Sequence, residues 1–131
     1  MKPFKFRVWH KPSKTWVSTE IVLYHDGKVD MCTAYENLDI TDNEDFEISY
    51  STGLFDYKGN YFYTGCVFEC FGERFILENE NGYFECVNLN NQKRYYFGDF
   101  MTNGDEIIGR LRKISEIIGD KFENPELLNI K

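Results

Sequence analysis

The chain has no long apolar run. None of its apolar stretches approaches the roughly 18–20 residues that a helix needs to cross a bilayer, so no membrane contact is expected. The apolar core of a signal peptide is also missing from the opening residues MKPFKFRVWHK, because Lys and Arg interrupt them. We therefore expect a cytoplasmic protein.

Positive charge is scarce. The net charge is −7 and the pI is about 4.8, whereas proteins that bind phosphates through counterion release need clustered Lys and Arg. Direct nucleic-acid binding is not expected. The acids concentrate between Glu36 and Glu47, with no basic residue among them, while the first sixteen residues hold five basic residues and no acid. These two segments could pair within one molecule or between molecules.

Histidine is nearly absent, which limits catalysis and metal binding. His10 and His25 are the two imidazoles, and we expect both in solvent, so a Cys–His nucleophile pair is not expected. Cys66 and Cys70 lie on one face of a predicted strand, roughly 13 Å apart, and no C-x-x-C pair occurs. With Cys32 and Cys86, we expect four reduced thiols in a reducing compartment.

Phosphate and calcium motifs are missing too. Neither G-x-x-x-x-G-K-[ST] nor G-x-G-x-x-G occurs. The acidic segment 36–47 lacks the glycine and glutamate spacing of an EF-hand, so we predict a solvated loop there, with at most a short helical turn. No catalytic, cofactor-binding or metal-binding residue is predicted, no cofactor is expected, and the chain is not expected to be an enzyme.

Aromatic residues are abundant, at 18% of the chain, and large rings favour strands. Phe4, Phe6 and Val8 alternate with Lys5, Arg7 and Trp9, the period-2 pattern of a half-buried strand. Asp26-Gly27 predicts a hairpin with a type I′ turn. Short strands at this spacing favour a barrel or a strongly curved sheet; further extended runs are expected at 15–17, 21–24, 28–31, 46–50, 66–71, 74–78, 83–89 and 95–97.

Glycines and caps predict the remaining elements. Gly53, Gly59 and Gly65 indicate a series of tight reversals at positive φ. One helix is predicted at Asp105–Arg112, and Ile114–Ile118 either extends it or, as the β-branched residues favour, forms a closing strand. At the end, Asn124-Pro125-Glu126 predicts a capped helical turn that docks Leu127 and Leu128 in a groove of the same chain or of another copy.

Three segments carry a family resemblance. Residues 5–9 (KFRVW), 51–67 (STGLFDYKGNYFYTGCV) and 117–128 (IIGDKFENPELL) resemble, in the same order, motifs of the YopX family of phage and prophage proteins. The resemblance implies a β-rich fold with an SH3-like barrel in the C-terminal part and an origin in a phage or prophage of a Gram-positive bacterium. It implies no activity. Thr64 and Cys66 depart from the family pattern, which has Glu and Asp there.

We therefore predict one mainly β domain over 1–131. It has a small curved sheet or hairpins in 1–50, a glycine-punctuated connection in 51–65, and a barrel-like part with a docked tail in 66–131, with one or two short helices. The predicted function is a protein-interaction module for an unknown protein partner or for self-association. The alternative is an acidic mimic of nucleic acid that blocks a host nucleic-acid-binding protein. Trp9 fits the core, and the candidate contact residues are Trp16, Tyr57, Tyr61, Tyr63, Leu127 and Leu128.

Overall fold

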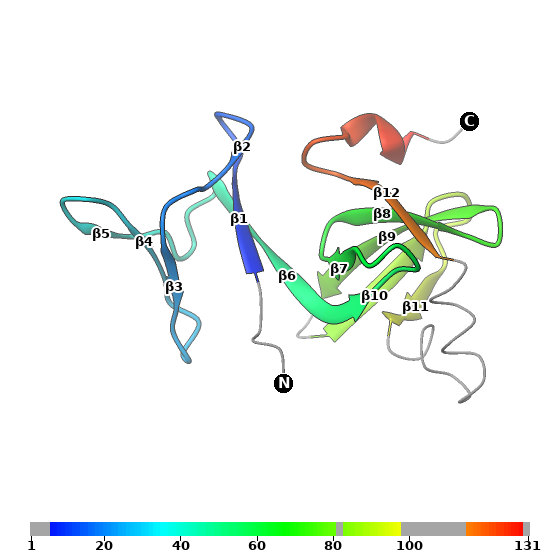
Figure 1. Cartoon of the computed structure of the whole chain (residues 1–131), viewed down its shortest axis with the longest axis horizontal. Coiled ribbons are helices and arrows are strands. Elements are labelled where there is room, and N and C mark those ends of the chain that lie inside the picture. The colour runs from blue at the N-terminus through cyan, green and yellow to red at the C-terminus, as the bar shows by residue number, and fades with distance from the viewer. Residues whose placement is uncertain (1–5, 81–82, 98–114, 130–131) are drawn as a thin grey trace. The chain divides into compact units, whose positions relative to one another are not determined.

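The computed structural model describes residues 6–80, 83–97 and 115–129 (Figure 1). Strands dominate these ranges, which confirms the mainly β prediction. The helix predicted at Asp105–Arg112 lies outside the described residues. The elements are β1 (Phe6–His10), β2 (Thr15–Trp16), β3 (Ile21–Leu23), β4 (Val29–Cys32), β5 (Asn37–Asp39), β6 (Phe46–Phe55), β7 (Tyr61–Tyr63), β8 (Cys66–Cys70), β9 (Glu73–Glu80), β10 (Tyr83–Asn88), β11 (Arg94–Tyr96), β12 (Glu116–Asp120) and the 3-10 helix η1 (Pro125–Leu128).

The chain divides into two compact units. One is Arg7–Ser49, and the other contains the described residues from Tyr50 onwards. The boundary falls inside β6, which lies between β1 and β7 in a sheet of order β2-β1-β6-β7. The first unit also holds a three-stranded sheet of order β3-β4-β5, and the second holds a five-stranded sheet.

The β3–β4 hairpin is present where the sequence predicted it, but its turn is of another type. Gly27 has a φ of 95° and donates its N–H to the carbonyl of Tyr24 at 3.0 Å, while the N–H of Tyr24 bonds to the carbonyl of Lys28 at 2.8 Å. This is a three-residue loop that ends in one left-handed glycine. The type I′ prediction is wrong, because of the two central residues only Gly27 has a positive φ.

The acidic segment contains a strand, which corrects the prediction of a loop with a helical turn. β5 pairs antiparallel with β4, and Asp39 lies opposite Asp30. Ile40 then donates its N–H to the carbonyl of Val29 at 2.9 Å, and both side chains are buried. Strand pairing and the burial of Ile40, which local charge does not reveal, hold the segment beside β4.

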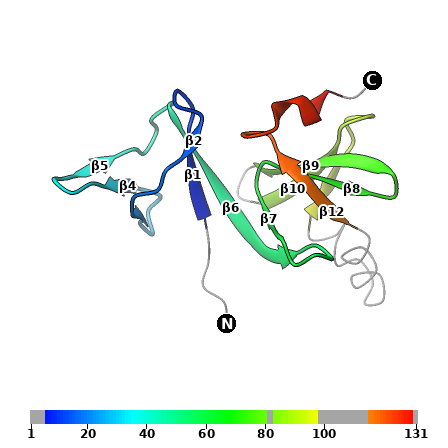
Figure 2. The same ribbon diagram turned by 45° about the horizontal axis from the view of Figure 1, so that its top comes forward.

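The five-stranded sheet has the order β11-β10-β9-β8-β12. Strands β8 to β11 follow one another as antiparallel neighbours, and β12 returns to pair antiparallel with β8. The sheet curls, as Figures 1 and 2 show. The strand favoured at Ile114–Ile118 is observed from Glu116 onwards and extends to Asp120, whereas Ile114 lies outside the described residues.

Alternating side chains give this sheet two different faces. One face carries an aromatic and thiol cluster, in which Phe68 stacks on Phe75 with ring centroids 5.4 Å apart and meets Phe62 edge-on at 5.2 Å. The opposite face carries a smaller aliphatic cluster of Val67, Ile76 and Val87, with Leu89, Ile118 and Leu127 packed against it. The side chain of Leu127 thereby joins the C-terminal segment to the sheet.

The three glycines at residues 53, 59 and 65 all have positive φ, as predicted. Gly53, however, lies within β6 instead of at a reversal. The β6–β7 register shifts between Ser51 and Phe55, and the side-chain oxygen of Ser51 accepts the N–H of Gly53 at 3.1 Å. Gly53 therefore belongs to a β-bulge, which sequence spacing did not separate from a turn.

The C-terminal turn forms at Pro125–Leu128, but its details differ from the prediction. The side chain of Asn124 does not cap η1; its Oδ1 accepts the N–H of Asp120 at 3.3 Å. Leu127 is half-buried, and its carbonyl accepts a hydrogen bond from Arg74 Nη1 at 3.2 Å. Leu128 remains 37% exposed, so one leucine of the predicted pair is docked and the other is not.

Candidate protein-interaction surface

Negative charge in the first unit lies on β3, β4, β5 and their connecting turns, which we call the acidic sheet, and on the segment that follows it. Residues 21–39 hold four acidic residues and one basic residue, Lys28, a net charge of −3, and residues 40–49 add four acidic residues. Most of this charge lies on exposed side chains, because the sheet is small and its core is limited to a few residues. Such a surface attracts basic groups over a distance of about one Debye length, ~8 Å at physiological salt.

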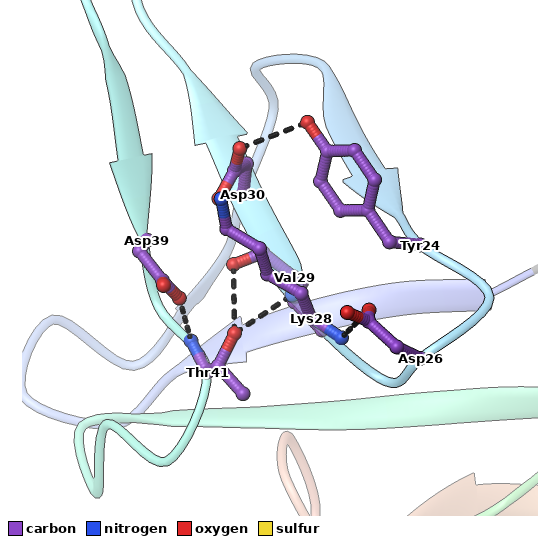
Figure 3. Close-up of polar contacts among 7 residues, drawn as sticks. All are labelled: Tyr24, Asp26, Lys28, Val29, Asp30, Asp39 and Thr41. Atoms are coloured by element: carbon purple, nitrogen blue, oxygen red, sulfur yellow. Dashed lines mark hydrogen bonds and ion pairs between the residues drawn. The ribbon is translucent and has the colours of Figure 1, made fainter.

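A polar cluster occupies β4 and its neighbours (Figure 3). The hydroxyl of Tyr24 donates to Asp30 Oδ2 at 3.0 Å, and this charged acceptor raises the pKa of Tyr24 above its ordinary value. Lys28 Nζ lies 3.8 Å from Asp30 Oδ1 and 5.3 Å from the Tyr24 ring centroid. The turn itself is held by Asp26 Oδ1, which accepts the N–H of Lys28 at 3.0 Å.

Asp39 and Thr41 hold the other side of the cluster (Figure 3). Asp39 Oδ1 accepts the N–H of Thr41 at 2.9 Å, and hydrogen bonds from Thr41 lower the pKa of Asp39. The Thr41 hydroxyl in turn accepts the N–H of Val29 at 2.8 Å and donates to its carbonyl at 3.4 Å. Asp39 is thus held ionised on an ordered backbone.

Asp30 is buried, with 5% of its surface exposed, and its Oδ1 accepts no hydrogen bond within the described part of the chain. Directly across the strand pair lies Asp39, a second carboxylate on the same face of the sheet. Like charges in such opposed positions destabilise a sheet. Lys28 Nζ, 3.8 Å from Asp30 Oδ1, is placed to offset this repulsion, and the Lys28 side chain is 47% exposed.

The tip of the β4–β5 hairpin presents Tyr35, which is 98% exposed. Thr33 orders this tip: its N–H and its hydroxyl both donate to the carbonyl of Glu36 at 2.8 Å, and its hydroxyl oxygen accepts the N–H groups of Tyr35 and Glu36. Sequence reasoning missed Tyr35. The signal available was an aromatic between turn-forming and acidic residues, where no strand could bury it.

Trp16, the predicted contact residue in the first unit, is half-buried within that unit. Its ring meets the Trp9 ring edge-on with centroids 4.9 Å apart, and the guanidinium of Arg7 lies 4.0 Å from its centroid. Trp9 is buried, as predicted for a core residue. Trp16 therefore contributes to packing on the exterior of that core.

The other predicted contact residues lie in the second unit and do not gather on one described site. Tyr57 is 52% exposed in the β6–β7 turn. Tyr61 and Tyr63 are half-buried in β7, and the Tyr61 ring contacts Phe55 with centroids 5.9 Å apart. Leu127 packs under the sheet, as described above. Among these residues Tyr57 is the most exposed aromatic.

The motif residues of the second unit meet around one buried carboxylate, Asp56, which is 1% exposed. Its Oδ1 accepts the N–H groups of Lys58 and Asn60 at 3.0 and 2.8 Å, and its Oδ2 accepts the N–H of Ile117 at 2.9 Å. An ion pair of 2.6 Å joins Lys58 to Glu116 at the surface. These contacts connect the 51–67 segment to β12 and give both motifs a structural role.

The cysteines and histidines form no catalytic pair among the described residues. Burial raises the pKa of Cys70, and it raises the pKa of Cys86 to about 12, which disfavours the thiolate that a nucleophile requires. All four cysteines are free thiols. His10 Nδ1 bonds to the Ser13 hydroxyl at 2.6 Å on an exposed turn. In the described ranges, no three His, Cys, Asp or Glu side chains are grouped to hold a metal ion.

Fold and surface together define a mainly β protein of two small units, with a curled sheet in one and an acidic sheet in the other. The chain matches the YopX protein family over residues 5–129 and belongs to that family. Its fold is similar to that of a solved structure, protein EF1440 from Enterococcus faecalis, at 19% identity and a TM-score of 0.56, covering 97% of this chain and 99% of that one. No curated protein matches the chain. Within the described ranges, no helix is long and apolar enough to span a membrane.

Proposed function

We propose that this YopX family member is a non-enzymatic protein-interaction module, an accessory protein of a phage or prophage that acts in the host cytoplasm. The observation that carries the proposal is Tyr35, a tyrosine that is 98% exposed on an ordered hairpin tip. Tyrosine is enriched among the residues that dominate binding energy at interfaces. A ring that contributes nothing to the core and costs little entropy to immobilise suits a contact with a partner.

The buried thiols support a role without catalysis. Their raised pKa values run against nucleophile activation, since an activated cysteine has a lowered pKa. The strand order of the second unit, a four-stranded meander with β12 returning beside β8, supports an SH3-like small barrel there. Folds of this kind serve as scaffolds for many binding functions, which is an argument by analogy.

A second candidate function rests on charge. The stretch from Glu20 to Ser49 carries a net charge of −8, which favours a mimic of nucleic acid that occupies a host nucleic-acid-binding protein. The two functions differ in how binding depends on salt. A mimic binds through exposed charges and weakens steeply as ionic strength rises, whereas an interface anchored by Tyr35 retains part of its affinity.

Affinity capture separates these functions. The full chain, tagged at one end, is used as bait in lysates of infected or lysogenic cells at low and at high salt. The module predicts a specific partner that remains bound at high salt and is lost when Tyr35 is replaced by alanine. The mimic predicts nucleic-acid-binding proteins that leave at high salt whichever residue is at position 35. If the bait captures nothing and is monomeric by light scattering, the interaction function is refuted.

A further inference from the structure

The acidic sheet combines an exposed aromatic with a carboxylate pair on one hairpin. Tyr35 lies in the turn of that hairpin, and Asp39 lies on β5 four residues further along the chain. Both are exposed, and the turn and strand that carry them are held by the hydrogen bonds of Thr33 and Thr41. A short extended peptide could therefore contact both residues at once without rearrangement of the hairpin.

The carboxylates of Asp30 and Asp39 can accept a hydrogen bond from a cationic group of a partner. Asp30 is 95% buried, and its Oδ1 accepts no hydrogen bond from the described residues, although a buried acceptor without a donor destabilises the fold. Its cross-strand neighbour Asp39 adds a second negative charge. Lys28 lies 3.8 Å from that oxygen, beyond hydrogen-bond distance, on an exposed and flexible side chain. A hydrogen-bond donor of a partner molecule could supply the hydrogen bond to Asp30 Oδ1 that Lys28 does not make.

Charge complementarity then selects the ligand. The acidic sheet, residues 21–39, carries a net charge of −3 and residues 40–49 carry another −4, so a cationic group is attracted and an anionic one is repelled. A guanidinium suits the pair better than an ammonium, because its planar fork binds carboxylates at two points and stacks on aromatic rings. Tyrosine faces attract such cations when the two lie within about 6 Å.

We propose that the acidic sheet docks an arginine-containing segment of a partner protein, with one guanidinium on the Asp30–Asp39 pair and Tyr35 as the aromatic anchor. This inference rests on the proposed function, since it names the chemistry of the partner. Lys28 moves aside in the complex, and its ammonium remains in solvent. The site requires a positively charged, extended peptide and gives no affinity for a neutral one.

The test is fluorescence anisotropy with the full chain and a labelled peptide in which arginine and serine alternate. A glutamine and serine peptide of equal length is the ligand control. Tyr35→Ala and Asp39→Asn should each weaken binding at least about tenfold, equivalent to ~1.4 kcal/mol. The matched variants Tyr57→Ala and Glu126→Gln, at exposed positions of the other unit, should leave the dissociation constant unchanged. Thermal unfolding of each variant confirms that it is folded.

Two results would overturn the docking site. Either the arginine peptide does not bind at low salt, or all four variants bind it equally, which shows attraction to net charge alone. Weakening by Tyr57→Ala in place of Tyr35→Ala would move the contact to the other unit and also refute the inference. The proposed function and the arginine site can be told apart by affinity capture. Capture at high salt of a partner that is lost with Tyr35→Ala but is insensitive to Asp39→Asn supports the interaction module and refutes the arginine site.

Discussion

Asp56 and Ile117 are joined by a hydrogen bond of 2.9 Å from the N–H of Ile117 to the buried carboxylate of Asp56, across sixty-one residues of sequence. The same carboxylate accepts two N–H groups of its own turn. The Tyr24–Lys28 turn of the first unit has the same backbone hydrogen bonds, but its Asp26 is exposed and accepts one N–H within that turn. One turn type thus serves as a surface loop in one unit and as an anchor for a distant strand in the other.

Replacing Asp56 with alanine should destabilise the protein strongly. Three N–H groups would lose their acceptor, two of them in the turn and one on β12, so a loss of about 3 kcal/mol or more is expected. The matched change Asp26→Ala removes one bond on an exposed turn and should cost less than about 1 kcal/mol. Urea denaturation followed by fluorescence measures both. Equal costs would show that the contact to Ile117 contributes nothing.

Replacing Gly65 with alanine should be the most harmful of the changes at the three motif glycines. Its φ is 94°, and an added Cβ would lie 2.5 Å from Phe122 Cε2, so strain and overlap add to about 2–4 kcal/mol. Gly59 has a similar φ of 87° with no atom within 4 Å, so Gly59→Ala reports the backbone strain alone, about 1 kcal/mol. Melting temperatures that fall equally would contradict the overlap with Phe122.

The two leucines of η1 should respond differently to truncation. Leu127 packs against the aliphatic cluster, so Leu127→Ala should cost about 1–2 kcal/mol. Leu128 is 37% exposed, and Leu128→Ala should cost less than about 0.5 kcal/mol. Deleting residues from Asn124 onwards should lower the melting temperature at least as much as Leu127→Ala does. A deletion that leaves both melting temperature and mass in solution unchanged would show that the tail is not docked.

Stability should fall at alkaline pH through Cys86. Burial raises its pKa to about 12 in the folded state, whereas the ordinary value is 9.0. The unfolded chain therefore releases this proton first, so the stabilising contribution is complete below about pH 9 and is lost as pH rises towards about 12. The slope of unfolding free energy against pH in that window should be shallower in Cys86→Ala by up to ~1.4 kcal/mol per pH unit. Equal slopes in both proteins would contradict the buried thiol.

Much of the strand pattern was predictable because alternation and turn residues are local signals. The runs at 66–71, 74–78 and 83–89 became β8, β9 and β10, and glycine positions predicted positive φ. β5 was missed because its three residues are exposed and two of them are polar, and pairing with β4 makes it a strand. The bulge at Gly53 was missed because a left-handed glycine is compatible with a turn and with a bulge alike.

The candidate surface was harder to predict than the fold. Acidity between Glu36 and Glu47 was visible, but the opposition of Asp30 and Asp39 depends on strand register, which no local pattern specifies. Tyr35 could not be separated from the other tyrosines by residue type. Trp16, predicted as a contact residue, is half-buried in its own unit, where its ring meets Trp9 and lies beside the guanidinium of Arg7.

The boundary between the two units falls within β6, between Ser49 and Tyr50, and not in a linker. A chain cut there leaves half of a strand on each side, with backbone groups that have lost their neighbours along the strand. An exchange of one unit between related chains would therefore have to transfer Phe46–Phe55 as a whole for both products to keep this strand.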